Sequence, residues 1–234
     1  MTARGFFVTG TDTNAGKTWI AAGLLSALGA RGHSTATMKP IASGCTQTPN
    51  GLRNDDALLL MRHASLPLPY ECVNPYAFAA PVAPHIAAQA SGRVIEIAPL
   101  KMIFEKISSQ ADYVIVEGVG GWKVPINVHE TTVDLAVALN LPVILVVGMR
   151  LGCLNHALLT CNSIVSYGLT LAGWVANTID TSYLEFDANV QALHNRIPAP
   201  LLGITPHLPH FDAGRISQAL AMENLMGVHE RFTK

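Results

Sequence analysis

The chain has 234 residues, half of them hydrophobic, and 15 Lys plus Arg against 16 Asp plus Glu give a net charge of -1. This length can bury one sizeable core, so we predict a single domain over residues 1–234. No basic run could follow a nucleic-acid backbone, and Gly, Pro or a charge interrupts every apolar stretch before the ~18 residues that span a bilayer, which argues against nucleic acid and membrane as partners.

The N-terminal segment and the cysteines bear on where the protein works. The stretch MTARGFFVTG has a hydrophobic part of only strand length, which ends in a glycine turn rather than in a cleavage site. Cys45, Cys72, Cys153 and Cys161 form no CxxC pair and have no neighbouring His at metal-ligand spacing. We therefore expect a cytoplasmic protein with reduced thiols.

Apolar runs bounded by turn residues alternate with segments of helical length. The predicted strands are residues 6–9, 34–38, 113–116, 143–147, 171–176 and 201–204, and the predicted helices are 19–30, 132–139, 155–167 and 214–226. The runs DYVIVEG and PVILVVG are apolar on both faces, as buried parallel strands are. The alternation predicts an α/β fold with a doubly wound, mostly parallel sheet and helices on both faces.

Residues 42–98 interrupt this alternation. They are rich in Pro and Gly around NPYAFAAPVAPH and are too long for a bare connection. We predict one helix there, near residues 55–62, within a functional excursion from the sheet.

The stretch GTDTNAGKT joins the first predicted strand to the first predicted helix. A P-loop follows the pattern G-x-x-x-x-G-K-[ST], and counting back from Gly16 puts Thr11 where the first glycine belongs. A chance Gly-Lys-Thr at a helix start is the alternative. The preceding strand and the apolar helix that follows favour a phosphate site, because backbone N–H groups and the helix dipole attract an anion. Lys17 would then bridge the β- and γ-phosphates and Thr18 would offer its hydroxyl to Mg2+.

Three further polar segments end or follow predicted strands, or begin a helix. Glu117 ends DYVIVE, at the carboxyl edge of the sheet where ligands of open α/β folds bind. Asp55 and Asp56 begin a helix, where acids are commonly caps. Lys39 follows the second strand and should project over the phosphate pocket, with Ser43 in the next turn. Each of these residues could instead have a purely structural role, at the surface, as a helix cap or in a turn.

Several motifs together resemble the dethiobiotin synthetase family. They are, in order, GTDTNAGKT, KPIASG, GLRNDDA, NPYAFAAPVAPH, VEGVGGWKVP, PVILVVGMRLGCLNHALLT and GWVAN. The resemblance covers most of the chain and is weak at residues 180–196 and after Leu208. It implies a fold of the P-loop NTPase type and an ATP- and Mg2+-dependent ligase of biotin biosynthesis. That enzyme would carboxylate 7,8-diaminopelargonate with CO2 and close the ring to dethiobiotin, through a carbamate and a carbamic-phosphoric anhydride.

The resemblance also implies roles for individual residues. Lys39 and Lys17 would be catalytic, Thr13 and Ser43 would hold the reacting end of the substrate, and Asp56 rather than Asp55 would complete the Mg2+ site. The Mg2+ site would consist of Thr18, Asp56 and Glu117. The ATP-binding residues would be Asn14, Ala15, Gly16, Lys17, Thr18, Trp19, Asp56, Glu117, Gly118, Val119, Gly120, Asn177, Thr178, Pro206, His207 and Leu208.

Two positions depart from the family pattern. Ala15 stands where valine is usual in the loop, a change expected to alter packing more than chemistry. In the family an acidic residue contacts the nucleotide, and counting without gaps puts Ala213 at that position, with Asp212 next to it.

The resemblance also matches the family's adenine-binding residue to Asn177. Asn177 ends GWVAN, and its amide can donate to and accept from the adenine edge.

The family's members are homodimers, and a helix N-terminus of the partner subunit holds the substrate carboxylate. The matching stretch LGCLNHA contributes the expected substrate-binding residues Gly152, Cys153, Leu154 and Asn155. His156 and the other histidines form no ligand cluster and are expected to be structural. We expect Trp122 to pack in the core rather than to cover the aliphatic chain of the substrate.

A P-loop switch ATPase of the partitioning type is the alternative from another functional class. Such proteins carry a second lysine near the start of the loop, whereas the first lysine here is Lys17. A membrane-targeting version would need a basic amphipathic terminal helix, and the predicted helix at 214–226 has Arg215 as its only basic residue. A nucleotide-binding module without activity is a third possibility, which would not need Lys39, Ser43 and two acids in one pocket.

Overall fold

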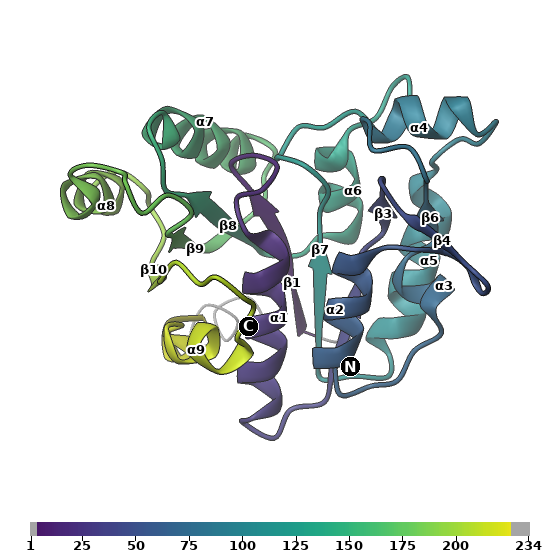
Figure 1. The fold of residues 1–234 in the computed structure, drawn as a ribbon, viewed down its shortest axis with the longest axis horizontal. Helices are drawn as coiled ribbons and strands as arrows, with labels where there is room; N and C mark the ends of the chain where they lie inside the picture. Colours follow the sequence, from purple (N-terminus) through teal and green to yellow (C-terminus); the bar gives the residue numbers. More distant parts are fainter. Residues whose placement is uncertain (1–3, 226–234) are drawn as a thin grey trace.

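The computed structural model describes residues 4–225, which form a central sheet of six parallel strands (Figure 1). The strand order is β10-β9-β8-β1-β7-β2. The bounds are β1 (Arg4–Gly10), β2 (Thr35–Met38), β7 (Tyr113–Glu117), β8 (Val143–Gly148), β9 (Leu171–Asn177) and β10 (Leu201–Thr205). Every neighbouring pair in this sheet is parallel. The predicted doubly wound α/β fold is confirmed.

Helices cover both faces of the sheet, and each face has its own core. On one face lie α1 (Lys17–Gly29), α2 (Asp55–His63) and α9 (Ala213–Gln218); on the other lie α5 (Ile97–Ser108), α6 (Thr132–Leu139), α7 (Cys153–Ser166) and α8 (Phe186–His194). Within β1, Phe6 and Val8 belong to the first core and Phe7 to the second. Because successive side chains alternate between two buried faces, these strands read as uninterrupted apolar runs.

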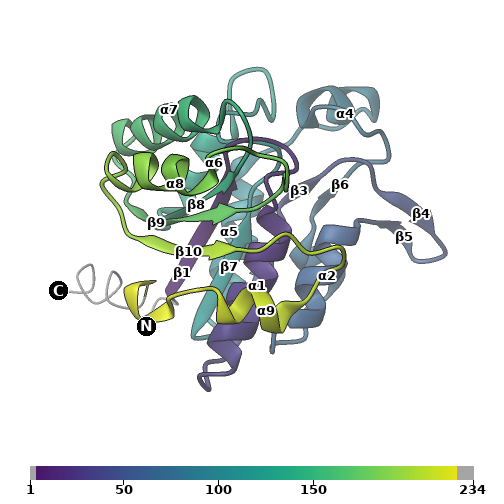
Figure 2. The same ribbon diagram turned by 60° about the vertical axis from the view of Figure 1, so that its left-hand side comes forward.

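The excursion between β2 and α5 contains more structure than the single predicted helix. That helix is α2, and α3 (Tyr70–Val73) and α4 (Pro84–Ala90) are additional. Two small sheets complete it: β3 (Ile41–Ala42) pairs with β6 (Tyr76–Ala77), and β4 (Thr46–Thr48) with β5 (Gly51–Arg53). Figure 2 shows the β4–β5 hairpin projecting from the body of the fold.

Outside this excursion, two further helices were not expected, and one was expected to be longer. The sequence did not predict α5 and α8, and the predicted helix at 214–226 ends in the structure at Gln218, with a separate helical turn at 222–225. The chain turns there because the Ala221 N–H donates to the Leu202 carbonyl, at 2.6 Å. A Cβ at Gly203 would overlap the carbonyl oxygen of Ala219, so glycine lets the chain approach β10. Met226 lies outside the described residues.

The carboxyl ends of the parallel strands meet at one edge of the sheet. The loop from β1 to α1, the segment after β2 and the ends of β7 and β9 all converge there. None of the described helices is long and apolar enough to cross a membrane.

Candidate functional site

The loop between β1 and α1 has the geometry of an anion cradle. Gly16 is the N-cap of α1, with φ 96°, and no side chain of the described residues caps this helix. Its first N–H groups therefore remain available to a ligand. Gly16 cannot be replaced easily, because a Cβ there would overlap the amide nitrogen of Asn177 and the positive φ would strain any L residue. Asn14, with φ 62°, is the other left-handed residue of the loop.

Thr11, which stands at the place of the first P-loop glycine, is tied to β8. Its N–H donates to the Val146 carbonyl at 3.0 Å, and its Oγ1 accepts from the Gly148 N–H at 3.3 Å. The φ angle of Thr11 is not positive, unlike those of Asn14 and Gly16 in the same loop. This position therefore does not need the conformational freedom of glycine.

A cavity of about 460 Å³ opens at this edge of the sheet. The predicted residues that line it are Thr13, Asn14, Gly16, Lys17, Thr18, Trp19, Lys39, Ser43, Asp56, Glu117, Val119, Gly120, Asn177, Thr178, Pro206, His207 and Leu208. Ala42, Asn54 and Ile179 line it as well and were not predicted. Asn54 had a signal in the sequence: it precedes the acid pair at the start of α2, and its side chain caps that helix by accepting from the Ala57 N–H at 3.1 Å.

Other predicted residues lie outside the described lining of the cavity. Ala15 and Gly118 are two of them, but both contact residues of the lining: the Ala15 carbonyl accepts from Asn177 Nδ2 at 2.9 Å, and the Gly118 carbonyl accepts from Lys39 Nζ at 3.2 Å. The remaining four, at the start of α7, are Gly152, Cys153, Leu154 and Asn155. Within one chain, the expected carboxylate anchor therefore lies outside the described lining of the cavity that contains the phosphate cradle.

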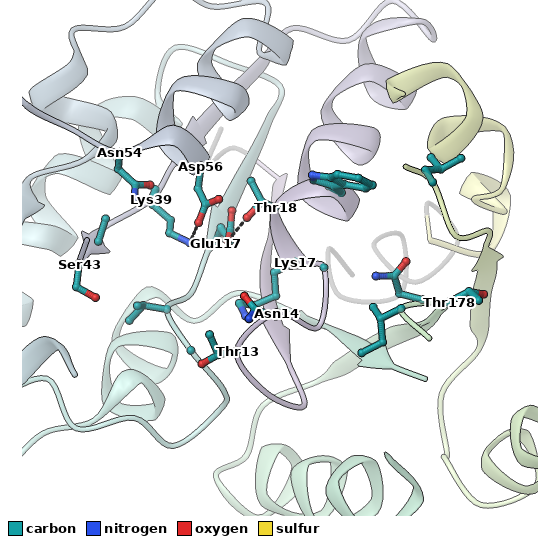
Figure 3. Close-up of a pocket in the computed structure, with 18 of the residues that line it drawn as sticks. Thr13, Asn14, Lys17, Thr18, Lys39, Ser43, Asn54, Asp56, Glu117 and Thr178 are labelled. Carbon is teal, nitrogen blue, oxygen red and sulfur yellow. Dashed lines mark hydrogen bonds and ion pairs between the residues drawn. The ribbon is translucent and has the colours of Figure 1, made fainter. Parts of the chain in front are cut away.

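Lys39 is the centre of a buried charge cluster (Figure 3). Its side chain is 4% exposed, and its Nζ lies 2.5 Å from Glu117 Oε1 and 3.2 Å from Asp56 Oδ2. Burial alone would lower the pKa of Lys39, but the carboxylates of Glu117 and Asp56 outweigh it and raise that pKa above its usual value. The ammonium is thus held in its charged form at the wall of the cavity.

Glu117 has one oxygen that is fully engaged and one that is not. Oε1 accepts from the Thr18 hydroxyl at 2.9 Å as well as from Lys39, whereas Oε2 is buried without a hydrogen-bond partner among the described residues. Burial raises the pKa of Glu117, and the Lys39 ammonium works against that rise. An unpartnered buried carboxylate oxygen is costly, so this atom calls for a ligand.

The oxygens of Thr18, Asp56 and Glu117 fit Mg2+. A hard cation prefers such oxygens and is commonly held by one or two carboxylates, substrate phosphates and water. Among the described residues, no group of three or more His, Cys, Asp or Glu could hold a metal by itself. The donor set therefore suits a cation that arrives with a phosphate ligand rather than one caged by protein alone.

Lys17 is the second buried cation of the cavity. Its side chain is 7% exposed, and its Nζ donates to the Asp12 carbonyl at 3.1 Å. Burial, followed by the nearby Lys39 ammonium, lowers the pKa of Lys17 to about 8. Asp12 also fixes the loop with its carboxylate, which accepts from the Thr13 N–H at 2.7 Å and pairs with Arg150.

The side of the cavity opposite Ser43 is built from the ends of β9 and β10. Figure 3 shows Thr178 on that side, with the P-loop residues between it and Ser43. Asn177 is 9% exposed; besides its bond to Ala15, its Oδ1 accepts from the Thr205 hydroxyl at 2.6 Å. The amide expected to read adenine thus braces the P-loop against β10 in the structure.

Asp212, Ala213, Trp122 and the cysteines, for which the sequence left the role open or predicted a structural one, have the following contacts. Asp212 caps α9 by accepting from the Arg215 N–H at 3.0 Å, and Ala213 is the first residue of that helix. Trp122 is 4% exposed, packs edge to face on Phe7 and donates to Ser163 Oγ at 3.1 Å. The four cysteines are free thiols.

Comparisons with known proteins agree with this geometry. Residues 4–215 match a family model described as an AAA domain. The ATP-dependent dethiobiotin synthetase BioD of Cellvibrio japonicus is 50% identical over 226 residues, which cover 97% of this chain and 99% of that protein. The protein of the same name from Pseudomonas aeruginosa is 51% identical over 221 residues, covering 94% and 97%.

Solved structures of low sequence identity share the fold. The MinD cell division protein of Aquifex aeolicus has a TM-score of 0.55 at 16% identity, covering 99% of this chain and 98% of that one. A ParA family ATPase from Chlorobium tepidum has a TM-score of 0.60 at 15% identity, covering 95% and 98%. At such identities the likeness speaks for the fold alone.

Proposed function

Since the chain belongs to the family of ATP-dependent dethiobiotin synthetases, we propose that it makes dethiobiotin from 7,8-diaminopelargonate, CO2 and ATP, in biotin biosynthesis. The observation that carries the proposal is the ammonium of Lys39, buried at the wall of the P-loop cavity between two carboxylates. Such a cation is placed to stabilise negative charge that develops beside the phosphates.

The proposed reaction needs no protein nucleophile. One neutral amine of the substrate adds to CO2 and loses a proton, which leaves a carbamate. A carbamate oxygen attacks the γ-phosphorus of ATP and releases ADP, giving a carbamic-phosphoric anhydride. The second amine then attacks the carbonyl carbon, closes the ring and expels phosphate. Each step depends on the alignment of the reactants and on neutralisation of charge, which are what a P-loop site provides.

We assign the two lysines to different parts of this reaction. Lys17 follows the Gly16 turn at the start of α1, so its ammonium would contact the β- and γ-phosphates. Lys39 lies on the Ser43 side of the P-loop in Figure 3 and would stabilise the carbamate and the transferring phosphoryl group. Thr13 and Ser43 also line the cavity and would orient the amine or carbamate.

We propose that Thr18, Asp56 and Glu117 hold Mg2+ together with ATP. When bound, the ion would neutralise charge on the β- and γ-phosphates. The two carboxylates that pair with Lys39, those of Asp56 and Glu117, both belong to this proposed Mg2+ site. Binding of the nucleotide with its metal would therefore weaken the hold of Glu117 and Asp56 on Lys39 and leave the ammonium to the substrate.

We further propose that the 234-residue chain acts as one domain and works as a homodimer. Gly152 is the N-cap of α7 with φ 94°, and no side chain of the described residues caps that helix, so its N–H groups can hold a carboxylate. Leu151, next to it, is 91% exposed, and Leu159 on the same helix is 61% exposed. A second copy that covers this apolar surface would place its substrate carboxylate at the α7 N-terminus.

We also propose that the protein is cytoplasmic. Free cysteines are typical of that compartment.

The proposal is tested by incubating the purified protein with ATP, Mg2+, bicarbonate and 7,8-diaminopelargonate and detecting dethiobiotin by mass spectrometry. ADP and phosphate should appear in step with dethiobiotin and should depend on the diamine. ATP hydrolysis that is indifferent to the diamine, with no dethiobiotin, would refute the proposal and favour a switch ATPase.

A further inference from the structure

Trp19 is a large aromatic residue directly after the P-loop motif. It is in the first turn of α1, two residues after Lys17, and it lines the cavity. Its side chain is half-buried. A large aromatic side chain in the first turn of this helix is not needed to bind phosphate, because backbone N–H groups, Lys17 and Thr18 serve that purpose.

The indole of Trp19 packs against a second aromatic ring. Phe211, in the segment between β10 and α9, packs edge to face on it, with ring centroids 5.8 Å apart and planes at 69°. Phe211 in turn packs on His63 of α2, at 5.0 Å and 67°. The row of rings thus joins α1, α2 and the segment after β10, and fixes the plane of the indole.

The cavity residues that follow β9 and β10 present both apolar and polar side chains. Thr178, Pro206, His207 and Leu208 line the cavity together with Trp19. The Asn177 amide, which could read a base edge, already bonds to the Ala15 carbonyl and the Thr205 hydroxyl. The flat face of a ligand would therefore meet the Trp19 ring, with Pro206 and Leu208 as apolar neighbours, rather than the engaged amide of Asn177.

We propose that Trp19 is the platform on which the nucleobase of ATP stacks, and that Phe211 is a positioning residue which sets the plane of the indole. This inference rests on the proposed function, because it takes the ligand of the cavity to be ATP. Stacking on an aromatic side chain contributes about 1 to 3 kcal/mol per base, which corresponds to roughly 5- to 150-fold in affinity. Since every base has a π-face, this part of nucleotide recognition tolerates changes of base.

The test compares ATP with inorganic tripolyphosphate, which has the phosphates and no base, by calorimetry in the presence of Mg2+. Trp19→Leu keeps an apolar side chain but loses the ring, and should bind ATP roughly 5- to 150-fold more weakly while it binds tripolyphosphate like the wild type. Trp19→Phe should recover most of the ATP affinity. Phe211→Leu should weaken ATP by less than Trp19→Leu and leave tripolyphosphate unchanged. Tyr167→Ala, at an exposed aromatic residue beyond α7, is the matched control and should change neither affinity.

Indole fluorescence gives a second readout of the same contact. ATP should quench the emission of the wild type, tripolyphosphate should not, and the response should be lost in Trp19→Leu. ATP affinity unchanged in Trp19→Leu would overturn the inference, and so would an equal loss for ATP and tripolyphosphate, which would mean that Trp19 only supports the loop. Neither of these results would contradict the proposed formation of dethiobiotin. A wild-type chain that binds no ATP would refute both the proposed function and this inference.

Discussion

Replacing Lys17 by Met should abolish ATP binding and, in the absence of ligand, stabilise the fold. The pKa of Lys17 falls from its usual 10.5 to about 8 because the ammonium is buried beside a second cation. One pKa unit corresponds to about 1.36 kcal/mol, so holding the charged form at this buried position costs roughly 3 kcal/mol at pH 7. Met has a similar length and no charge, and should recover that free energy as a rise of about 6 to 12 °C in Tm.

The pH dependence gives this prediction its sign. Between pH 8 and 10.5 the unfolded wild type binds more protons at Lys17 than the folded protein does, so its free energy of unfolding rises with pH in that window. The advantage of Lys17→Met should thus be largest at pH 7 and much smaller at pH 9.5. Saturating ATP with Mg2+ should reverse the order at pH 7, because only the wild type gains from ligand binding.

The assay is thermal and urea unfolding of both proteins at pH 7 and pH 9.5, with and without ATP. Lys101→Met, at an exposed lysine of α5, is the matched control and should leave the free energy of unfolding almost unchanged. The reasoning is refuted if Lys17→Met is less stable than the wild type at pH 7 without ligand, or if its advantage is the same at both pH values.

Three further predictions concern the reaction, the brace of the loop and the assembly. Lys39→Ala should lower dethiobiotin formation roughly 100-fold or more while calorimetry still detects ATP binding, and near-normal turnover would contradict its catalytic assignment. Asn177→Ala should weaken ATP more than the diamine and weaken tripolyphosphate along with ATP, because the Ala15 carbonyl loses its donor; a loss confined to ATP would mean that the amide reads the base instead. Leu151→Asp should shift the protein from dimer to monomer in light scattering and raise the KM for 7,8-diaminopelargonate, whereas Val94→Asp, at another exposed apolar residue, should do neither. A dimeric Leu151→Asp protein with an unchanged KM would argue against the shared site.

Strands β7 and β8 could be predicted from the sequence because burial on both faces makes each of them a continuous apolar run. Helix α5 was missed although Leu100, Phe104 and Ile107 follow a helical spacing and are buried in the second core. Pro99 near its start made the segment resemble the Pro-rich excursion before it. Helix α8 falls in the part of the chain where the family resemblance is weak, and its N-cap is Glu185 in a left-handed conformation, which no sequence rule favours.

The gathering of polar residues at the cavity could be predicted because each one ends a strand or begins a helix at the same edge of a parallel sheet. The partners of those residues could not. Asn177 and Ala15 are 162 residues apart in the chain, and their hydrogen bond exists only because β9 ends beside the P-loop. The contact of Trp19 with Phe211 likewise depends on how the segment after β10 crosses α1. Such pairings follow from the packing of elements that are distant in sequence, and no local pattern records them.

The charges of Lys39, Glu117 and Asp56 have a consequence for how this family can diverge. Lys39 is 4% exposed and Glu117 is 1% exposed, so a change of Lys39 alone leaves the Glu117 carboxylate in the interior without its cation, at a cost of roughly 3 to 5 kcal/mol. A change of Glu117 alone leaves Lys39 with only the part-exposed Asp56 as its partner. The cost of an unpaired charge is a large fraction of the total stability of an ordinary domain. A descendant that no longer performed the reaction would still be selected to keep both residues, simply in order to fold. Retention of this pair in a distant relative is therefore weak evidence that the relative is a working enzyme, and its joint replacement is the more telling sign of a new role.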